Sequence, residues 1–432
     1  MNISRRSFVG AGAAMFAAAG CKSVMGPSQD GKLIAGFEQT DTRGDVSQPW
    51  EPYSDRKVRI AIAGEGVCSF GSAFGYQDHP NAEVIACTDL DPAKCAKLQQ
   101  RVRAKRTYAS CEELLEKEKE IDAIYIATDA PSHFRLATKA LNRGLHVVSA
   151  VPALFGIEQL DMIPDFLAAL KKSGCVYQMN ETSAYHADLY AMRKIYEAGY
   201  MGEIVYAEGE YFHSDTYGKL DSLWIPSYNN WRLGLPPQYY PTHSNAYYTC
   251  VTHKRFTEVS CAGVPSLYKY FQAANNRYKN PFGSEIALFR GEEGAAVRMC
   301  VTWVTPSRRG EEGRVWGQKG SFEQERFNAS SQKLRKADPT RPTLKADHYE
   351  GWFEKEVYGL NLLKPQLPPQ LKAGHHGGSS GYLTEDFLKS ILVKGHKPCV
   401  DAVTALNTTV AGIYAHMSAM KGGETLKIPS FA

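Results

Sequence analysis

Short apolar runs alternate with helix-like stretches between Val58 and about Gln178. Five of the six residues of Val58–Ala63 are apolar, and Ile121–Ala127 and Leu145–Ser149 are similar runs. Continuous apolar runs of this length are typical of strands buried on both faces of a parallel sheet. The alternation therefore predicts an α/β domain with a parallel sheet between helices, in which ligands bind beyond the carboxyl ends of the strands.

The pattern changes after residue 180. Strand-like segments such as Glu203–Phe212 and Ala295–Trp303 follow one another with hairpin turns between them, and helices become rare until the C-terminal part of the chain. An antiparallel run after a parallel domain predicts an α+β domain with a broad, mostly antiparallel sheet. We expect the first domain at residues 56–180 and the second at residues 181–432.

Residues 1–21 resemble an export signal. Arg5 and Arg6 lie in a segment similar to the twin-arginine motif, and a short apolar run of small residues follows and ends at Cys21. The run is too short for an ordinary transmembrane helix. The pattern predicts export to the periplasm with a lipid anchor on Cys21, and a plain secretory signal with an incidental cysteine is the alternative. The polar, proline-containing residues 22–55 are expected to form a linker.

The composition is that of a soluble globular protein. Of the 432 residues, 43% are hydrophobic and 22% are charged, which is enough apolar material for two cores. A net charge of +4 is too small to indicate nucleic-acid binding. The ten cysteines form no CxxC pair and no cluster with zinc-ligand spacing, so we expect free thiols and no metal site.

A glycine turn follows the first predicted strand. Gly64, Gly66 and Ser69 fall on the spacing of a dinucleotide-binding fingerprint, and Val67 and Cys68 lie inside the turn. The first glycine allows a tight turn, the second lets the backbone approach a pyrophosphate, and the small third residue lets the next helix pack closely. This spacing after a buried strand predicts a Rossmann domain that binds a dinucleotide.

The other predicted strands of this domain also end at residues that would face the cofactor. Asp89 ends the second strand, where a carboxylate holds a ribose hydroxyl and repels a 2′-phosphate, which favours NAD over NADP. The alternative role of Asp89 is to cap the helix that begins near Pro92. The remaining cofactor candidates follow the third and fourth strands: they are Thr128, His133, Ala150, Val151 and Pro152.

Candidates for chemistry on a sugar lie beyond the parallel domain. Oxidation of a hydroxyl requires a base, and His243, in a polar segment, has a suitable ordinary pKa. Tyr240 is placed to share a proton relay with His243, and Tyr185 is a candidate for the leaving-group step. Arg232 beside Trp231 suits a sugar clamp. The alternatives are a structural histidine, packed tyrosines and a surface ion pair.

Several of these motifs together resemble the Gfo/Idh/MocA family of NAD(P)-dependent sugar and polyol oxidoreductases. They are the glycine fingerprint, Asp89, Ile126–Thr128 with His133, the predicted strand at Gly144–Val148, and Gly202–Val205. Most of that family carries Glu-Lys-Pro after the fourth strand, and its lysine assists hydride transfer. Here the tripeptide is Ala150–Pro152, so that lysine is missing.

The tripeptide instead resembles that of glycoside hydrolase family 109, a branch that keeps NAD bound and cleaves glycosides, although those hydrolases have Glu where this chain has Ala150. Further matches are Glu181 with Tyr185, Trp231–Leu233, Tyr240–His243 and His376–Gly378. The resemblance implies bound NAD, a carbohydrate substrate contacted by Glu181, a homo-oligomer, and glycoside cleavage through transient oxidation of the C3 hydroxyl. A sugar dehydrogenase or sugar–sugar oxidoreductase, and a non-catalytic sugar-binding lipoprotein, are the alternatives.

Overall fold

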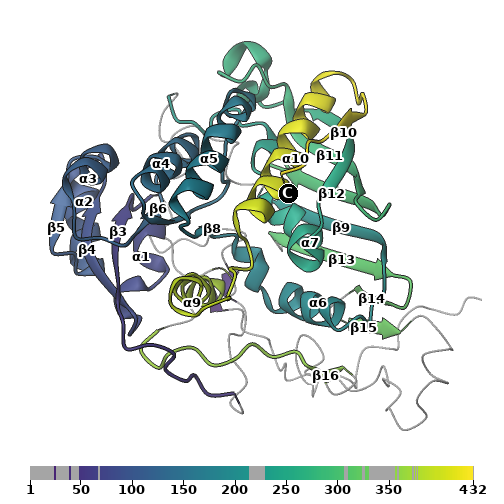
Figure 1. Ribbon diagram of the computed structural model, residues 1–432. Coiled ribbons are helices and arrows are strands. Elements are labelled where there is room, and N and C mark those ends of the chain that lie inside the picture. Colours follow the sequence, from purple (N-terminus) through teal and green to yellow (C-terminus); the bar gives the residue numbers. More distant parts are fainter. Residues whose placement is uncertain are drawn as a thin grey trace, which may run out of the picture.

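The structure is a computed structural model, and it describes two domains built on two sheets (Figure 1). The expected export signal, including Cys21, lies outside the described residues, and so do Val67 and Cys68. The described residues are 48–66, 69–213, 229–305, 310–323, 360–371 and 378–431, with short pieces at 24–25, 38–39, 326–329, 356–357, 374 and 376.

The N-terminal sheet has six strands, and every neighbouring pair in it is parallel. Strand β3 lies in its interior, and all of its residues except Arg59 are buried. The parallel sheet predicted from the apolar runs is therefore confirmed. In sheet order the strands are β5 (Arg106–Tyr108), β4 (Ala82–Thr88), β3 (Val58–Ala63), β6 (Ala123–Ile126), β7 (His146–Ser149) and β8 (Tyr177–Met179).

Helices cover both faces of this sheet. Side chains of α4 and α5 share a core with one face, whereas side chains of α2 and α9 pack against the other face. Figure 1 shows α4 and α5 on one side of the sheet and α9 on the other. Helix α9 belongs to the C-terminal part of the chain, so the chain returns to close its first domain. The helices of this domain are α1 (Phe70–Ala73), α2 (Pro92–Val102), α3 (Cys111–Lys117), α4 (Ala130–Asn142), α5 (Ile163–Ser173) and α9 (Ser379–Leu392).

The second sheet has eight strands, and only its β9–β12 pair is parallel. The predicted broad, mostly antiparallel sheet is confirmed. In sheet order the strands are β15 (Arg326–Ala329), β14 (Gly320–Glu323), β13 (Glu311–Gly317), β9 (Ile204–Phe212), β12 (Ala296–Thr302), β11 (Phe282–Gly291), β10 (Phe256–Pro265) and β18 (Leu426–Lys427). Two further pairs are β1 (Val24–Met25) with β2 (Glu38–Gln39) and β16 (Glu356–Val357) with β17 (Leu360–Asn361).

Three helices, α6 (Ala187–Glu197), α7 (Thr242–Thr252) and α10 (Ala402–Met420), lie on the side of this sheet that faces the first domain (Figure 1). Helix α7 is buried along its whole length because the sheet lies on one side of it and α6 and α10 lie beside it. Among the described helices, none is long and apolar enough to cross a membrane. The 3-10 helices are η1 (Tyr76–Asp78), η2 (Ile157–Met162), η3 (Thr182–Tyr185), η4 (Pro237–Tyr239), η5 (Lys269–Phe271) and η6 (Ala273–Asn275).

Candidate active site

The glycine turn after β3 has a backbone that only glycine adopts easily. Gly64 has a φ of +94°, and a Cβ atom there would lie 2.5 Å from the carbonyl oxygen of Ala127. The turn therefore lies directly against the loop that follows β6. The helix after it, α1, is short, and its point of closest approach is Gly71, where a Cβ atom would lie 2.3 Å from the Gly64 carbonyl oxygen. The fingerprint spacing predicts the close contact between turn and helix at Ser69, whereas the structure has it at Gly71.

Asp89 lies beside this turn. Its Oδ2 accepts a hydrogen bond of 2.9 Å from the backbone N–H of Glu65, between the two glycines of the fingerprint. The cap of α2 is Asp91, whose side chain accepts from the N–H groups of Ala93 and Lys94. Asp89 is therefore not that cap. Its Oδ1 accepts from the Asp91 backbone N–H at 2.9 Å, so two backbone bonds hold the carboxylate at the end of β4, where a ribose would lie.

The loops after β6 and β7 are joined by His133. Its Nδ1 lies 2.9 Å from the carbonyl oxygen of Pro152, and its Nε2 lies 3.1 Å from that of Thr128. Burial lowers the pKa of His133, so the ring is neutral and donates to only one of the two carbonyls at a time. Ala150 and Val151 are buried between these loops. His133 thus shapes the floor of the site rather than offering a free group to a ligand.

Together these residues fit a dinucleotide. The turn at Gly64 and Gly66, the carboxylate of Asp89, and the loops at Thr128 and Ala150–Pro152 all lie at the carboxyl edge of the parallel sheet. A tight glycine turn of this kind brings backbone close to a pyrophosphate, and a carboxylate at the position of Asp89 accepts from a ribose. Nicotinamide would then supply a hydride acceptor next to the second domain.

His243 comes to this edge from the first turn of α7. Helix α7 lies very close to the sheet because glycines replace side chains beneath it. A Cβ atom on Gly209 of β9 would lie 2.0 Å from the Ser244 carbonyl oxygen, and one on Gly313 of β13 would lie 2.0 Å from the ring of Tyr247. The close packing sets the distance from His243 to the strands on both sides of it.

Two carboxylates face the same ring nitrogen of His243. Its Nδ1 lies 2.8 Å from Glu181 Oε1 and 3.7 Å from Glu311 Oε1, and the three side chains are at most 6% exposed. Burial alone would lower the pKa of His243, but the two carboxylates outweigh it and raise the pKa to about 9. Burial opposes ionisation of Glu181, yet His243 keeps the pKa of Glu181 below its ordinary value. At neutral pH the cluster is therefore charged, with His243 mainly as an imidazolium, and the neutral ring that can accept a proton becomes the main form above about pH 9.

Neutral and cationic side chains surround this cluster. His186 Nδ1 lies 3.5 Å from Glu311 Oε2, and Ser183 Oγ donates to the same oxygen at 2.5 Å. Burial, with the nearby Lys364 and His243, lowers the pKa of His186 to about 3. Burial also lowers the pKa of Lys364 to about 7, and its Nζ donates to the Tyr185 carbonyl oxygen at 2.8 Å. Nothing in the local sequence marks Ser183, His186, Glu311 or Lys364, so none of these four residues was expected at the site.

Aromatic rings and a guanidinium lie on the other side of His243. The Tyr211 and Tyr240 ring centroids are 4.5 and 5.6 Å from that of His243. The Arg232 guanidinium lies 4.2 Å from the centroid of Trp231 and 5.7 Å from that of Tyr240. The structure thus brings together His243, Tyr240, Arg232 and Trp231, as the sequence predicts, and adds Tyr211. Such a set can hold a sugar through stacking and donor groups.

Two expected residues have other surroundings. Glu181 is fully buried and bonded to His243, so it acts on that base rather than on a substrate, contrary to expectation. The Tyr185 ring stacks on Tyr382 at 5.8 Å, and its phenol lies beside Asp386; burial and this carboxylate raise its pKa. Within the described residues Tyr185 makes no contact with His243, and its role at the leaving group stays a prediction.

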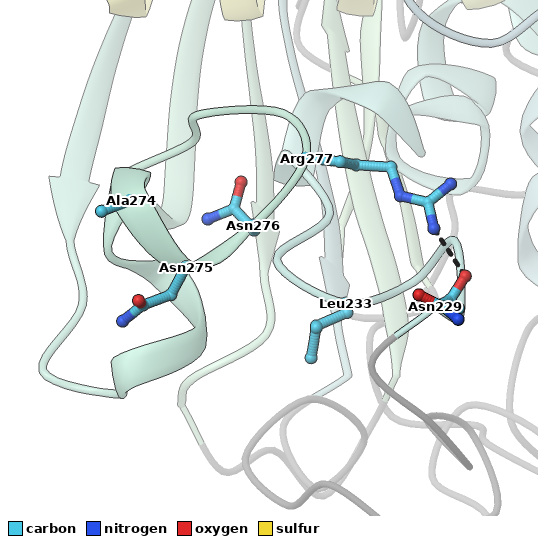
Figure 2. Close-up of a pocket in the computed structure, with 6 residues that line it drawn as sticks. All are labelled: Asn229, Leu233, Ala274, Asn275, Asn276 and Arg277. Carbon is cyan, nitrogen blue, oxygen red and sulfur yellow. Dashed lines mark hydrogen bonds between the residues drawn. The ribbon is translucent and has the colours of Figure 1, made fainter.

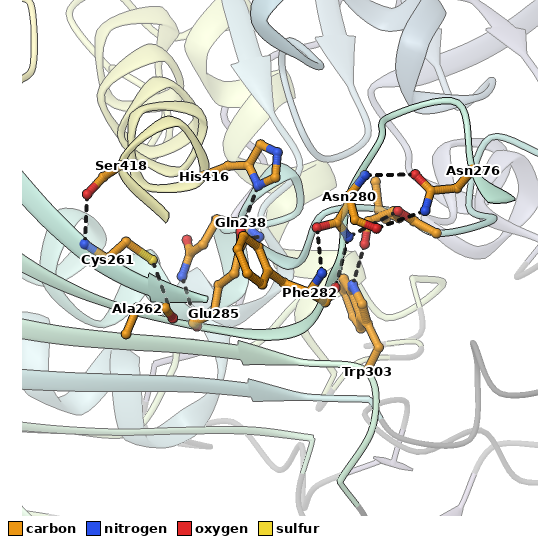
Figure 3. Close-up of polar contacts among 12 residues, drawn as sticks. Gln238, Cys261, Ala262, Asn276, Asn280, Phe282, Glu285, Trp303, His416 and Ser418 are labelled. Carbon is orange, nitrogen blue, oxygen red and sulfur yellow. Dashed lines mark hydrogen bonds and ion pairs between the residues drawn. The ribbon is translucent and has the colours of Figure 1, made fainter. Parts of the chain in front are cut away.

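A buried polar network fastens the loop that carries Trp231, Arg232 and Tyr240 (Figure 3). Glu285 of β11 accepts from the Gln238 backbone N–H at 2.7 Å and pairs with His416 Nδ1 of α10 at 2.7 Å. The Trp303 indole donates to the Leu235 carbonyl oxygen at 3.0 Å. These bonds hold the loop on the sheet next to His243.

A surface cavity of about 300 Å³ lies beyond this loop and is lined by Asn229, Leu233 and residues 274–277 (Figure 2). Its polar groups are used internally: Asn276 Nδ2 donates to three backbone carbonyls, and Arg277 Nη2 donates to the Asn229 carbonyl oxygen. None of the cavity residues belongs to the cluster around His243. Among the described residues, no three histidine, cysteine, aspartate or glutamate side chains are arranged to hold a metal ion.

The fold and the turn define a dinucleotide-binding Rossmann domain with an attached sheet domain. Residues 58–181 match the Gfo/Idh/MocA family model, described as an oxidoreductase family with an NAD-binding Rossmann fold. The N-terminal domain is thus similar to the NAD-binding domain of the Gfo/Idh/MocA oxidoreductases, and NAD is the cofactor of its Rossmann turn.

Curated relatives carry the name of the expected branch. A glycosyl hydrolase family 109 protein of Porphyromonas gingivalis is 29% identical over 189 residues, which are 41% of this chain and 38% of that protein. Glycosyl hydrolase family 109 protein 3 of Phocaeicola vulgatus is 24% identical over 370 residues, 77% of this chain and 64% of that protein. Each match spans less than two thirds of the relative's length.

Solved structures share the fold. Levoglucosan dehydrogenase in complex with NADH and levoglucosan has a TM-score of 0.64 at 16% identity, covering 87% of this chain and 100% of that one. Scyllo-inositol dehydrogenase of Lactobacillus casei, with bound NAD(H) and scyllo-inositol, has a TM-score of 0.61 at 16% identity, covering 86% and 99%. At this identity the likeness shows the fold alone.

Proposed function

We propose that this protein is an exported NAD-dependent glycosidase that cleaves glycosides through transient oxidation of the C3 hydroxyl. One observation carries the proposal: His243 is held by carboxylates at Nδ1 beside a sugar-binding set of side chains, at the cofactor edge. In the described part of the chain all polar contacts of His243 are at Nδ1. Nε2 is therefore left for a substrate hydroxyl, which is the geometry of a general base.

The residues would act in sequence. Trp231 and Arg232 hold the sugar, and the neutral form of His243 takes the hydroxyl proton at Nε2 while its Nδ1–H stays hydrogen-bonded to the ionised Glu181. The resulting ketone acidifies the C2 hydrogen, so that a base removes it, the aglycon leaves and water adds. His243 then returns its proton to the C3 oxygen. When held at the turn of Gly64 and Gly66, NAD would supply the hydride acceptor, and because cleavage is redox-neutral no external nucleotide would be consumed.

Two alternatives use the same site differently. A sugar dehydrogenase or sugar–sugar oxidoreductase would need the same base, and the dehydrogenase fold of the structural neighbours is compatible with it. A non-catalytic sugar-binding protein would have little use for buried charges, because burying Glu181, Glu311 and His243 costs several kcal/mol per ion before pairing compensates. The names of the curated relatives favour the glycosidase.

The test is cleavage of aryl glycosides in heavy water with no added nucleotide. We expect aglycon release and deuterium at C2 of the released sugar, because that carbon is deprotonated during the reaction. A direct two-carboxylate hydrolase would leave that hydrogen in place. His243→Ala should abolish both cleavage and transient NADH, whereas His146→Ala, at the opposite end of the parallel sheet, should retain them.

Other outcomes separate the alternatives. Cleavage without deuterium, unaffected by His243→Ala, would refute the proposed mechanism. Net NADH formation with an intact glycoside would establish the dehydrogenase. Sugar binding with neither product would establish a binding protein.

A further inference from the structure

Two carboxylates face Nδ1 of His243, whereas a single carboxylate is enough to orient a histidine that acts as a base. Glu181 already accepts a hydrogen bond of 2.8 Å from the Nδ1–H, and it lies in the loop that follows β8 of the parallel sheet. Glu311 belongs to the other sheet, as the first residue of β13, and its Oε1 lies 3.7 Å from the same nitrogen. That distance is too long for a hydrogen bond but suits an ion pair.

Ser183 connects Glu311 to the other members of the cluster. Its Oγ donates to Glu311 Oε2 at 2.5 Å and lies 3.4 Å from His243 Nδ1. Its backbone N–H donates to Glu181 Oε1 at 2.9 Å. Ser183 therefore fixes both carboxylates relative to each other, and the hydroxyl is committed to Glu311 rather than to the histidine.

The position of Glu311 is also set by its strand. Glu311 is paired with Tyr211 across the β13–β9 ladder, and the Tyr211 ring lies against His243. The close contact of Gly313 with Tyr247 holds α7 on the same strand. The side chain of Glu311 is only 3% exposed, so it is held in place rather than free to turn into solvent.

We propose that Glu311 is a positioning residue for the base His243: it fixes the ring with Nδ1 protonated and Nε2 facing substrate, and it stabilises the imidazolium formed when Nε2 takes up the hydroxyl proton. This role rests on the proposed function in one point only, namely that the proton comes from a substrate hydroxyl. The proton moves from the hydroxyl oxygen to Nε2 and later returns, and Glu311 and Glu181 stay ionised throughout.

The charges around His243 come from every side of it. Glu181 and Glu311 raise its pKa, whereas burial lowers it. The neighbouring His186 and His213 are neutral, since burial lowers the pKa of each to about 3. Arg232 and Lys364 are the nearby cations that act on His213 and His186 respectively. Removing Glu311 thus leaves Glu181 as the carboxylate partner of His243.

The experiment is an NMR titration of the histidine rings in the purified protein, with the His243 signal assigned by its loss in His243→Gln. In the wild type the midpoint is expected at about 9. Glu311→Gln should lower it by about one pH unit or more, because an opposite charge within a few ångströms shifts a pKa by that much. The matched control is Glu312→Gln, the next residue of the same strand, which points to its exposed face and should leave the midpoint unchanged.

Further variants keep the result decisive. Glu311→Asp retains the charge and should restore part of the shift, and Ser183→Ala should lower the midpoint without removing a charge. An unchanged midpoint in Glu311→Gln, or equal shifts in Glu311→Gln and Glu312→Gln, would overturn the assignment. The titration needs no substrate, so it stands if no glycoside is cleaved. Where transient NADH forms, its pH dependence should move down together with the midpoint.

Discussion

Buried charge is the main feature of this protein at the scale of single residues. His243 and Glu181 are both removed from water; the charged form of His243 is stabilised by Glu181 and Glu311, and that of Glu181 by His243 and by the backbone N–H of Ser183. Removal of one partner of such a group would leave an uncompensated charge, which costs about 3–5 kcal/mol. A fold that only had to be stable would gain more from apolar side chains at these positions. The cluster is therefore best explained by chemistry.

Asp89 provides a second test at residue scale. Asp89→Ala should weaken NAD binding, because the ribose loses its acceptor. It should also raise affinity for NADP relative to NAD about tenfold or more, which corresponds to about 1.4 kcal/mol of removed repulsion. The measurement is titration of nucleotide-depleted protein with both dinucleotides.

The control for that experiment is Asp91→Ala. Asp91 lies two residues away and caps α2, so its loss should lower stability but leave the ratio of the two affinities unchanged. An unaltered ratio in Asp89→Ala, or protein purified with NADP bound, would contradict the assignment.

At the scale of elements, the site depends on how closely α7 lies on the second sheet. Gly209 and Gly313 belong to neighbouring strands, and both leave room for backbone or ring atoms of α7. The helix itself has no solvent-exposed face, since every residue of Thr242–Thr252 is buried. Its position is therefore determined by packing and by the missing side chains beneath it, and this position places His243 between Glu181 and Glu311.

Gly209→Ala should displace α7. The new Cβ atom would lie 2.0 Å from the Ser244 carbonyl oxygen, and backbone cannot yield as a flexible side chain does. We expect a loss of about 1–3 kcal/mol in the free energy of unfolding, typical of overpacking, measured by denaturant titration. Oxidation of the sugar should fall as well, because Nδ1 moves from its carboxylates.

A glycine without close neighbours serves as the comparison. Gly144 has a φ of +80° and no atom within 4 Å of an added Cβ. Gly144→Ala should lower stability through backbone strain yet leave activity per folded molecule unchanged. Equal activity in the two variants would show that α7 packing does not position His243.

At the scale of the molecule, the candidate site lies where the two domains meet. The parallel sheet supplies the cofactor edge, and the second domain supplies α7, β13 and the loop with Arg232. Glu181 follows β8 of the parallel sheet, whereas His243 lies on α7 against the second sheet, so the base and its first carboxylate come from elements of different sheets. The chain returns to the first domain at helix α9, which packs in the core of that domain. This second connection limits how far the two domains can separate.

Export is the remaining prediction at this scale, and it falls outside the described residues. Arg5 and Arg6 together should be required for export, because the twin-arginine route recognises that pair. Cys21→Ser should move the protein from the membrane to the soluble periplasmic fraction, measured by fractionation and immunoblotting. An unchanged distribution would reject the lipid anchor, and periplasmic protein after replacement of both arginines would reject the route.

The parts that the sequence predicts correctly are those set by local chemistry. The buried run Val58–Ala63 and the fingerprint at Gly64 and Gly66 specify a parallel strand and its turn, because burial and backbone conformation act over a few residues. The antiparallel sheet after residue 180 follows from strand-like runs in the same way. Arg232 beside Trp231 also required only neighbouring residues.

The tertiary structure alone decided which side chains share the site. Glu181 and Glu311 lie far from His243 in sequence. Only the β-sheet register and the close packing of α7 on the second sheet bring all three together. The same contacts assign Glu181 to the base and bring α9 back to the first domain. Distances between residues remote in sequence depend on packing of whole elements, which periodicity and motif spacing do not encode.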